Sequence, residues 1–110
     1  MNHDLDLKAQ VKQILKLVQE VAPGRSVELR IPPFAAIQCV TGSTHRRGTP
    51  PNVVEMSAET LLKLLENPVK WQQYCDLGSI SASGTNSNLG NLFARVGKLM
   101  KSKVRAKNGE

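Results

Sequence analysis

The residues best suited to chemistry lie together in one segment of the chain. His45, Arg46 and Arg47 are consecutive within residues 41–51, a stretch that also holds two glycines and two prolines. An imidazole beside two guanidinium groups can contact an anion or take part in acid–base catalysis. The same residues also fit an exposed basic loop that is held by ion pairs, for example with Glu55. The exposed loop is the simpler interpretation, and the residue types leave both open.

Few other residues have the types and spacing that catalysis or metal binding needs. The second histidine, His3, lies close to the N-terminus, and the two cysteines, Cys39 and Cys75, are far apart and lack metal-ligand spacing. The glycines near the C-terminus form neither a phosphate loop nor a dinucleotide-binding pattern. We therefore predict a protein that is not an enzyme and that has no metal site and no cofactor.

The cysteines and the N-terminal segment bear on the cellular location. We expect Cys39 and Cys75 to be free, buried thiols in a reducing compartment. The first eight residues, MNHDLDLK, carry acids and lack the basic start and apolar stretch of a secretory signal. No apolar run is long enough for a transmembrane segment. These features predict a cytoplasmic protein.

The positive charge is concentrated at the C-terminus. Residues 95–110 hold six basic residues and one acidic residue, a net charge of +5, whereas residues 1–94 hold nine basic and eight acidic residues, a net charge of +1. A basic segment of this kind can attract nucleic acid or anionic lipid, or can simply keep a helix end solvated. The aromatic residues are not interleaved with the basic ones, so nucleic-acid binding ranks last.

The first half of the chain predicts one helix and three strands. A helix is expected before Pro23, because an apolar stripe repeats every three or four residues: Leu7, Val11, Ile14, Leu15, Val18 and Val21. Residues 26–31 alternate between apolar and polar, which is typical of a half-buried strand. Residues 34–40 are nearly all apolar, which predicts a strand covered on both faces or at the sheet centre. Residues 52–56 form a short third strand.

The second half predicts two short helices, a strand and a long helix. Ser57 caps a leucine-rich helix, and Asn67 caps a second helix whose first residue is Pro68. That helix carries Trp71 and Tyr74 and ends near Gly78. Residues 79–83 form a strand with Ile80 and Ala82 on one face. Asn86 or Ser87 caps the last helix, whose apolar stripe comprises Leu89, Leu92, Phe93, Val96 and Met100.

This order of elements predicts an α+β fold. The length of 110 residues suits one domain. Strands that follow one another early in the chain favour a mainly antiparallel sheet of four or five strands, with the helices on one face. We place the domain at residues 1–102 and expect residues 103–110 to be a basic, disordered tail, because the apolar stripe fades beyond Lys101.

The order of elements in residues 52–93 resembles the C-terminal half of the sterol carrier protein (SCP) family. In that family a strand leads into a capped, leucine-rich helix, followed by a short helix, a strand bounded by glycines and the final helix. The matching positions are Val53–Val54, Ser57, Leu61–Leu65, the helix around Trp71, Gly78, Ile80, Ala82, Gly84 and Leu89–Leu92. Residues 25–40 and 45–55 are similar to a bacterial single-domain branch of the family.

The resemblance implies a fold and a ligand class. It implies a five-stranded sheet with helices over one face and, in the lipid-carrying members, an apolar tunnel between the two layers. The chain would then be a non-catalytic module that binds an apolar or amphipathic, lipid- or sterol-like molecule. The residues expected around this ligand are Leu61, Leu65, Trp71, Tyr74, Ile80, Leu89, Leu92 and Phe93. The alternative for each of them is that it simply fills the core.

A second hypothesis makes the chain an accessory or regulatory domain. Domains of this fold occur fused to enzymes, among them thiol-dependent maleylpyruvate isomerases, where such a domain would bind a protein partner. Both hypotheses use the same fold, and they differ in whether an apolar site exists.

Overall fold

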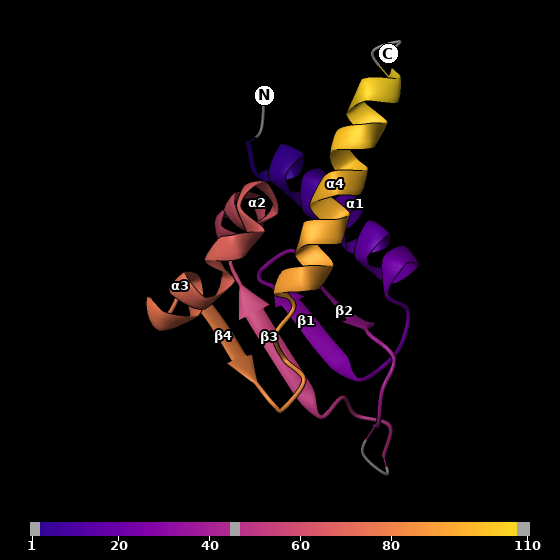
Figure 1. Cartoon of the computed structure of the whole chain (residues 1–110), viewed down its shortest axis with the longest axis vertical. Coiled ribbons are helices and arrows are strands. Elements are labelled where there is room, and N and C mark those ends of the chain that lie inside the picture. Colours follow the sequence, from indigo (N-terminus) through magenta and orange to yellow (C-terminus); the bar gives the residue numbers. More distant parts are fainter. Residues whose placement is uncertain (1–2, 45–46, 108–110) are drawn as a thin grey trace.

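The computed structural model describes residues 3–44 and 47–107, and it contains helices and strands in a mixed order along the chain. In chain order the elements are α1 (His3–Val21), β1 (Val27–Ile31), β2 (Ala35–Cys39), β3 (Asn52–Met56), α2 (Ala58–Glu66), the 3₁₀ helix η1 (Pro68–Lys70), α3 (Trp71–Asp76), β4 (Ile80–Ser83) and α4 (Gly90–Lys107). The helices gather on one side of the sheet, so the molecule has two layers (Figure 1). This α+β architecture confirms the predicted fold class.

The described strands form one sheet of four strands in the order β2-β1-β3-β4. The β1/β2 and β3/β4 pairs are antiparallel, as expected for a mainly antiparallel sheet. The two central strands, β1 and β3, are parallel, with Leu29 opposite Val54. The sequence did not predict this pair, because the segment after β2 returns the chain to the other side of β1 before β3 begins.

The alternation of β1 and β3 separates a buried face of the sheet from an open face. Val27, Leu29 and Ile31 of β1 are fully buried and face the helices. The intervening Arg30 lies on the opposite face, where it forms ion pairs with Glu28 and Glu55. The hydrogen bond to Glu28 and the charge of that carboxylate, with a smaller contribution from Glu55, raise the pKa of the Arg30 guanidinium above its ordinary value. One face of the sheet therefore supports the core, and the other is a polar surface.

The position of β2 corrects one prediction. The apolar run from residue 34 to 40 predicted a strand covered on both faces or at the sheet centre, but β2 is an edge strand. Of its residues only Cys39 is fully buried, and Ala36 is exposed opposite Arg30 on the open face. Two alanines in the strand make the segment read as apolar, although they bury little surface.

The predicted helix cap is correct at the start of α2 and wrong at the starts of η1 and α4. The Ser57 hydroxyl oxygen accepts a hydrogen bond from the Thr60 backbone N–H at 3.1 Å, as predicted for the start of α2. Asn67 precedes η1 without a capping hydrogen bond from its side chain, although Pro68 does occupy the first turn. At the start of α4 it is Asn88, two residues before the helix, whose side-chain oxygen accepts from Gly90 N–H at 2.9 Å.

The residues that we expected to cap α4 have other partners. The Asn86 backbone N–H donates to the side-chain oxygen of Asn52 at 3.0 Å, and the Ser87 hydroxyl donates to the Gly84 carbonyl at 2.9 Å. Asn52 is itself buried and donates to the Ser26 carbonyl at 2.8 Å. Asn52 thus ties the loop after β4 to the start of β1, with its side-chain oxygen and nitrogen both hydrogen-bonded.

The last helix is longer than its apolar stripe. Its backbone is helical to Lys107, so it includes residues 103–107 of the segment expected to be a disordered tail. Residues 108–110 lie outside the described part of the chain. α4 extends beyond the other helices along the longest dimension of the molecule (Figure 1).

Candidate functional site

Most of the residues expected around a ligand belong to the hydrophobic core. Leu61, Leu65, Trp71, Ile80, Leu89, Leu92 and Phe93 are buried, and Tyr74 is half-buried. The Phe93 side chain is fully buried and its ring stacks on Trp71, with ring centroids 6.3 Å apart. Such complete burial is what close packing produces, and the role of these residues in ligand binding remains a prediction.

The strand beneath this cluster differs from the expectation at one residue. Ile80 and Ala82 share a face of β4, since they pair with Met56 and Val54. Ile80 is buried, but Ala82 is exposed, so only one of the two residues contributes to the core.

The clearest hollow with an apolar lining lies between helices, and Leu65 is the member of this cluster that lines it. It is an open groove of about 570 Å³ between α1, α2 and α4. Its lining residues are Gln10 from α1, Leu62, Leu65 and Glu66 from α2, and Gly97, Met100 and Lys101 from α4. We call this hollow the α2–α4 groove. Its walls are mostly apolar, and its polar groups are one amide, one carboxylate and one ammonium.

Gly97 allows α2 and α4 to approach closely beside the groove. A side-chain Cβ at this position would lie 2.7 Å from the Leu65 carbonyl oxygen, a distance that real contacts do not reach. The backbone of α4 therefore lies directly against the end of α2, and Leu62 and Met100, both half-buried, line the groove beside this contact. An isolated glycine within a helical pattern often has such a packing role, and it is the signal by which the sequence could have indicated this site.

A second hollow adjoins the groove on the side of η1. It measures about 210 Å³ and shares Leu65, Glu66, Gly97 and Lys101 with the α2–α4 groove. Its other lining residues are Pro68, Val69, Ala94 and Lys98. The two hollows therefore adjoin each other beside the middle of α4.

Three of the predicted ligand residues also reach hollows near the start of α4. Trp71 lines a hollow of about 490 Å³ beside η1. Leu89 and Leu92 line another hollow, of about 580 Å³, whose surroundings include Arg95 and several threonine and asparagine side chains. Of the eight predicted residues, Leu65 is in the α2–α4 groove, and Leu62, Gly97 and Met100 are groove residues that the prediction missed.

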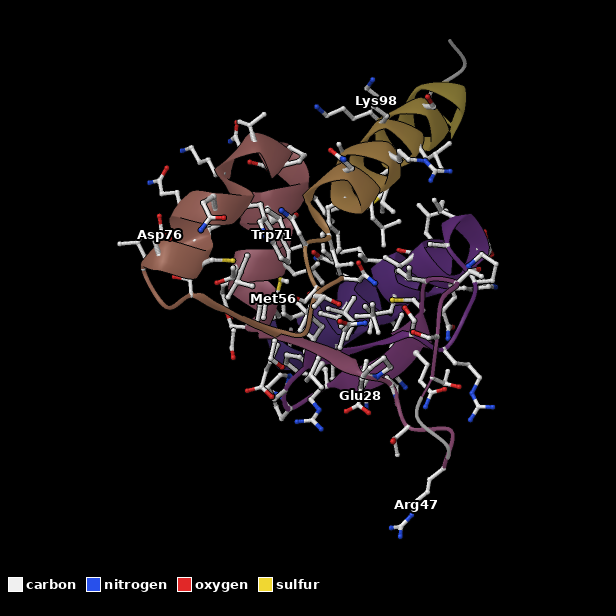
Figure 2. All side chains as sticks on the ribbon, turned by 60° about the horizontal axis from the view of Figure 1, so that its bottom comes forward. Glu28, Arg47, Met56, Trp71, Asp76 and Lys98 are labelled. Atoms are coloured by element: carbon white, nitrogen blue, oxygen red, sulfur yellow. The ribbon has the colours of Figure 1, made fainter. Side chains whose placement is uncertain are left out.

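Of the three residues of the basic loop, the structure describes Arg47, whereas His45 and Arg46 lie outside the described residues. Arg47 is exposed and lies at the opposite end of the molecule from Lys98 (Figure 2). Glu55, the suggested ion-pair partner of this loop, pairs with Arg30 on the open face of the sheet.

The two cysteines are free, but they differ in burial. Cys39 is fully buried, and burial raises the pKa of its thiol to about 11. Cys75 is only half-buried, and its thiol pKa is raised by burial and by the nearby charge of Asp76. A raised pKa keeps both groups in the thiol form near neutral pH, so neither has the properties of an activated nucleophile.

Within residues 3–44 and 47–107, no group of three or more histidine, cysteine or acidic residues could hold a metal ion. No helix in the same part of the chain combines the length and the apolar character needed to cross a membrane.

Comparison with known families agrees with this architecture. A family model described as the bacterial SCP ortholog matches residues 4–94, which is most of the chain. The chain therefore belongs to the sterol carrier protein-like family, as its sequence pattern predicted. No curated protein matches the chain.

Proposed function

We propose that this protein is a non-catalytic binding module for an amphipathic, lipid-like molecule, and that the molecule binds in the α2–α4 groove. The observation that carries the proposal is an open, mostly apolar groove of about 570 Å³ in a member of an SCP-like family. Small-molecule sites typically have volumes of about 300–1,000 Å³ and combine apolar walls with a few polar groups.

The lining of the groove favours an amphipathic ligand over a wholly apolar one. Leu62, Leu65 and Met100 offer contacts to an alkyl chain, whereas Gln10 and Lys101 offer hydrogen-bond donors to a polar head. Glu66 lies in the same lining and disfavours a ligand that is negatively charged along its whole length. A single acidic or hydroxyl head group on an alkyl chain satisfies both parts of the groove.

The absence of catalytic function and the cytoplasmic location are parts of the same proposal. The titratable residues of the groove, Glu66 and Lys101, stand beside apolar side chains, and the thiol pKa values of Cys39 and Cys75 are raised. Apolar groove walls and thiols that stay protonated favour binding of a ligand over catalysis of its reaction.

Two measurements test the proposal with the whole chain. Native mass spectrometry of the freshly purified protein should detect a bound lipid-sized mass. Titration with the fluorescent fatty acid cis-parinaric acid should give saturable binding at micromolar concentration. Leu62→Glu places a carboxylate against the bound alkyl chain and should weaken binding by about tenfold or more, because burying a charge in an apolar site is costly.

Leu77→Glu is the matched control. Leu77 is 68% exposed after α3 and lines none of the hollows described above, so the same substitution should leave binding unchanged. Unchanged binding in Leu62→Glu would exclude the groove as the site. Failure of the parent protein to bind cis-parinaric acid or any co-purified lipid would contradict the function and favour the accessory-domain alternative.

A further inference from the structure

The net positive charge of the chain is concentrated in the last part of its sequence. Residues 95–110 carry a net charge of +5, out of +6 for the whole chain. Residues 95–107 of this segment belong to α4, and Figure 1 shows the far end of this helix away from the sheet. Arg95, Lys98 and Lys101 are exposed, so α4 presents basic side chains to the solvent.

An apolar side chain is exposed next to this charge. Val69, on η1, has 92% of its surface exposed, more than any other large apolar side chain described. It lines the hollow of about 210 Å³ together with Pro68, Lys98 and Lys101. We call these four residues the η1–α4 surface. Because the Val69 side chain is almost fully exposed beside Pro68 and the two lysines, it does not contribute to the packing of the core.

The two lysines of this surface have no carboxylate partners among the described residues. Lys98 and Lys101 are exposed. In the described part of the chain, the basic residue that forms ion pairs is Arg30, on the other face of the sheet. Glu66 is also in the lining of the hollow, and it is too far from either lysine to form an ion pair with it. Their charges are therefore available to an external anion.

From these observations we propose that the η1–α4 surface docks the protein on an anionic lipid bilayer. The negative surface of such a bilayer complements the unpaired lysines, and the region just beneath the head groups accepts an apolar side chain such as Val69. A nucleic acid would use the lysines but not Val69, and it would gain from exposed aromatic rings, whereas Trp71 is buried and stacked on Phe93. The combination favours the bilayer.

Docking does not depend on a ligand in the groove. It would support the proposed function by placing the groove next to the bilayer. The η1–α4 surface and the α2–α4 groove share Lys101, and the hollow that this surface lines also shares Leu65, Glu66 and Gly97 with the groove. A bilayer on this surface would lie at the side of the groove, where a lipid could pass between the two. The proposal thus adds an interaction surface to the proposed binding function and fails or succeeds separately from it.

The test is flotation of the full chain with vesicles at physiological ionic strength. The vesicles contain phosphatidylcholine and phosphatidylglycerol in a two-to-one ratio, with pure phosphatidylcholine as the uncharged comparison. The protein should float with the anionic vesicles only, and added salt should release it. Lys98→Gln with Lys101→Gln should lower partitioning about 25-fold, at about fivefold for each basic residue near the surface.

Two further variants separate the surface from overall charge. Lys16→Gln with Arg47→Gln removes the same charge from exposed positions outside the η1–α4 surface and should change partitioning only slightly. Val69→Ser should weaken partitioning several-fold while leaving the charge unchanged. Equal losses in the two double variants would overturn the proposed surface.

Other outcomes would overturn the proposal as a whole. Equal flotation with uncharged vesicles would exclude recognition of anionic lipid. Binding to a DNA duplex that survives physiological salt and exceeds binding to anionic vesicles would assign the lysines to nucleic acid. A protein that binds cis-parinaric acid but does not float with anionic vesicles would refute docking and leave the proposed function intact.

Discussion

Helix α4 meets its neighbours in two different ways along its length. Nearer its start, Phe93 and Val96 are fully buried, and Trp71 stacks against Phe93. Farther along the helix, Gly97 touches α2 and Met100 lines an open groove. Both halves belong to one apolar stripe in the sequence. What surrounds each residue, and not its type, decides whether the stripe forms core or a candidate site.

The largest test of this difference is the loss of a large side chain from each half. Phe93→Ala should lower the free energy of unfolding by about 3–5 kcal/mol, because it leaves a cavity in a closed core. Met100→Ala should cost about 1 kcal/mol or less, since the side chain is only half-buried beside open space. Equilibrium unfolding in urea measures both. Similar losses would show that the two halves of α4 are packed alike.

The thiols allow a second comparison between closed and open regions. Burial raises the Cys39 pKa to about 11 in the folded protein from 9.0 for an unperturbed thiol. The resulting stability is fully present below pH 9 and is lost as the pH rises through 11, because the unfolded chain then releases a proton that the folded one retains. A shift of this size corresponds to about 2–3 kcal/mol over this range.

The measurement compares the parent protein with Cys39→Ala between pH 8 and about pH 11.5, a range that spans the unperturbed and the buried thiol. The stability difference between the two proteins should shrink over this range, whereas Cys75→Ala, at a half-buried position, should show a weaker trend. A constant difference for Cys39→Ala would mean that solvent reaches this thiol in the folded state, and that the core is less closed at β2.

The elements with a single buried face were the ones that the sequence predicted well. α1 buries the predicted stripe, apart from Val21, which is half-buried, and β1 alternates as expected because its neighbours cover only one face. The start of α2 was predictable because the Ser57 cap depends only on residues of the next turn. Such signals are local, and local patterns record them directly.

The errors concern contacts between distant segments. The edge position of β2 and the parallel pairing of β1 with β3 depend on how the chain returns after β2, which no local pattern encodes. The buried Asn52 was missed because its partners, Ser26 and Asn86, are 26 and 34 residues away. The groove was missed for the same reason: Leu62 and Met100 line one hollow only once α2 and α4 are packed.

A smaller effect is expected where the two helices touch. Gly97→Ala raises helix propensity by about 1 kcal/mol, but its Cβ would lie 2.7 Å from the Leu65 carbonyl, and overpacking costs about 1–3 kcal/mol. We expect overpacking to prevail, with a net destabilisation of about 1 kcal/mol in urea unfolding. Ser102→Ala, at an exposed position on the same helix, is the control and should stabilise by a few tenths of a kcal/mol. A stabilising Gly97→Ala would show that α2 can move away at little cost.

The smallest effect on stability is expected at the end of α4. Deletion of residues 103–110 removes three basic residues and one acidic residue, so the net charge falls from +6 to +4. Met100 is the last residue of the apolar stripe, and Lys101 and Ser102 are exposed, so the deletion should change the free energy of unfolding by less than about 1 kcal/mol. Part of that change comes from the loss of Lys103, Arg105 and Lys107, because positive charges near the C-terminus of a helix interact favourably with the helix dipole.

The same deletion should have a larger effect on association than on folding. Loss of positive charge at this end of the molecule should weaken flotation with anionic vesicles, and it should abolish any weak, salt-sensitive affinity for DNA. Urea unfolding and flotation of the shortened chain, compared with the full chain, separate the two effects. A loss of stability of about 2 kcal/mol or more would show that the end of α4 packs on the body. The closed region of the helix would then extend past the groove, and the contrast between its two halves would disappear.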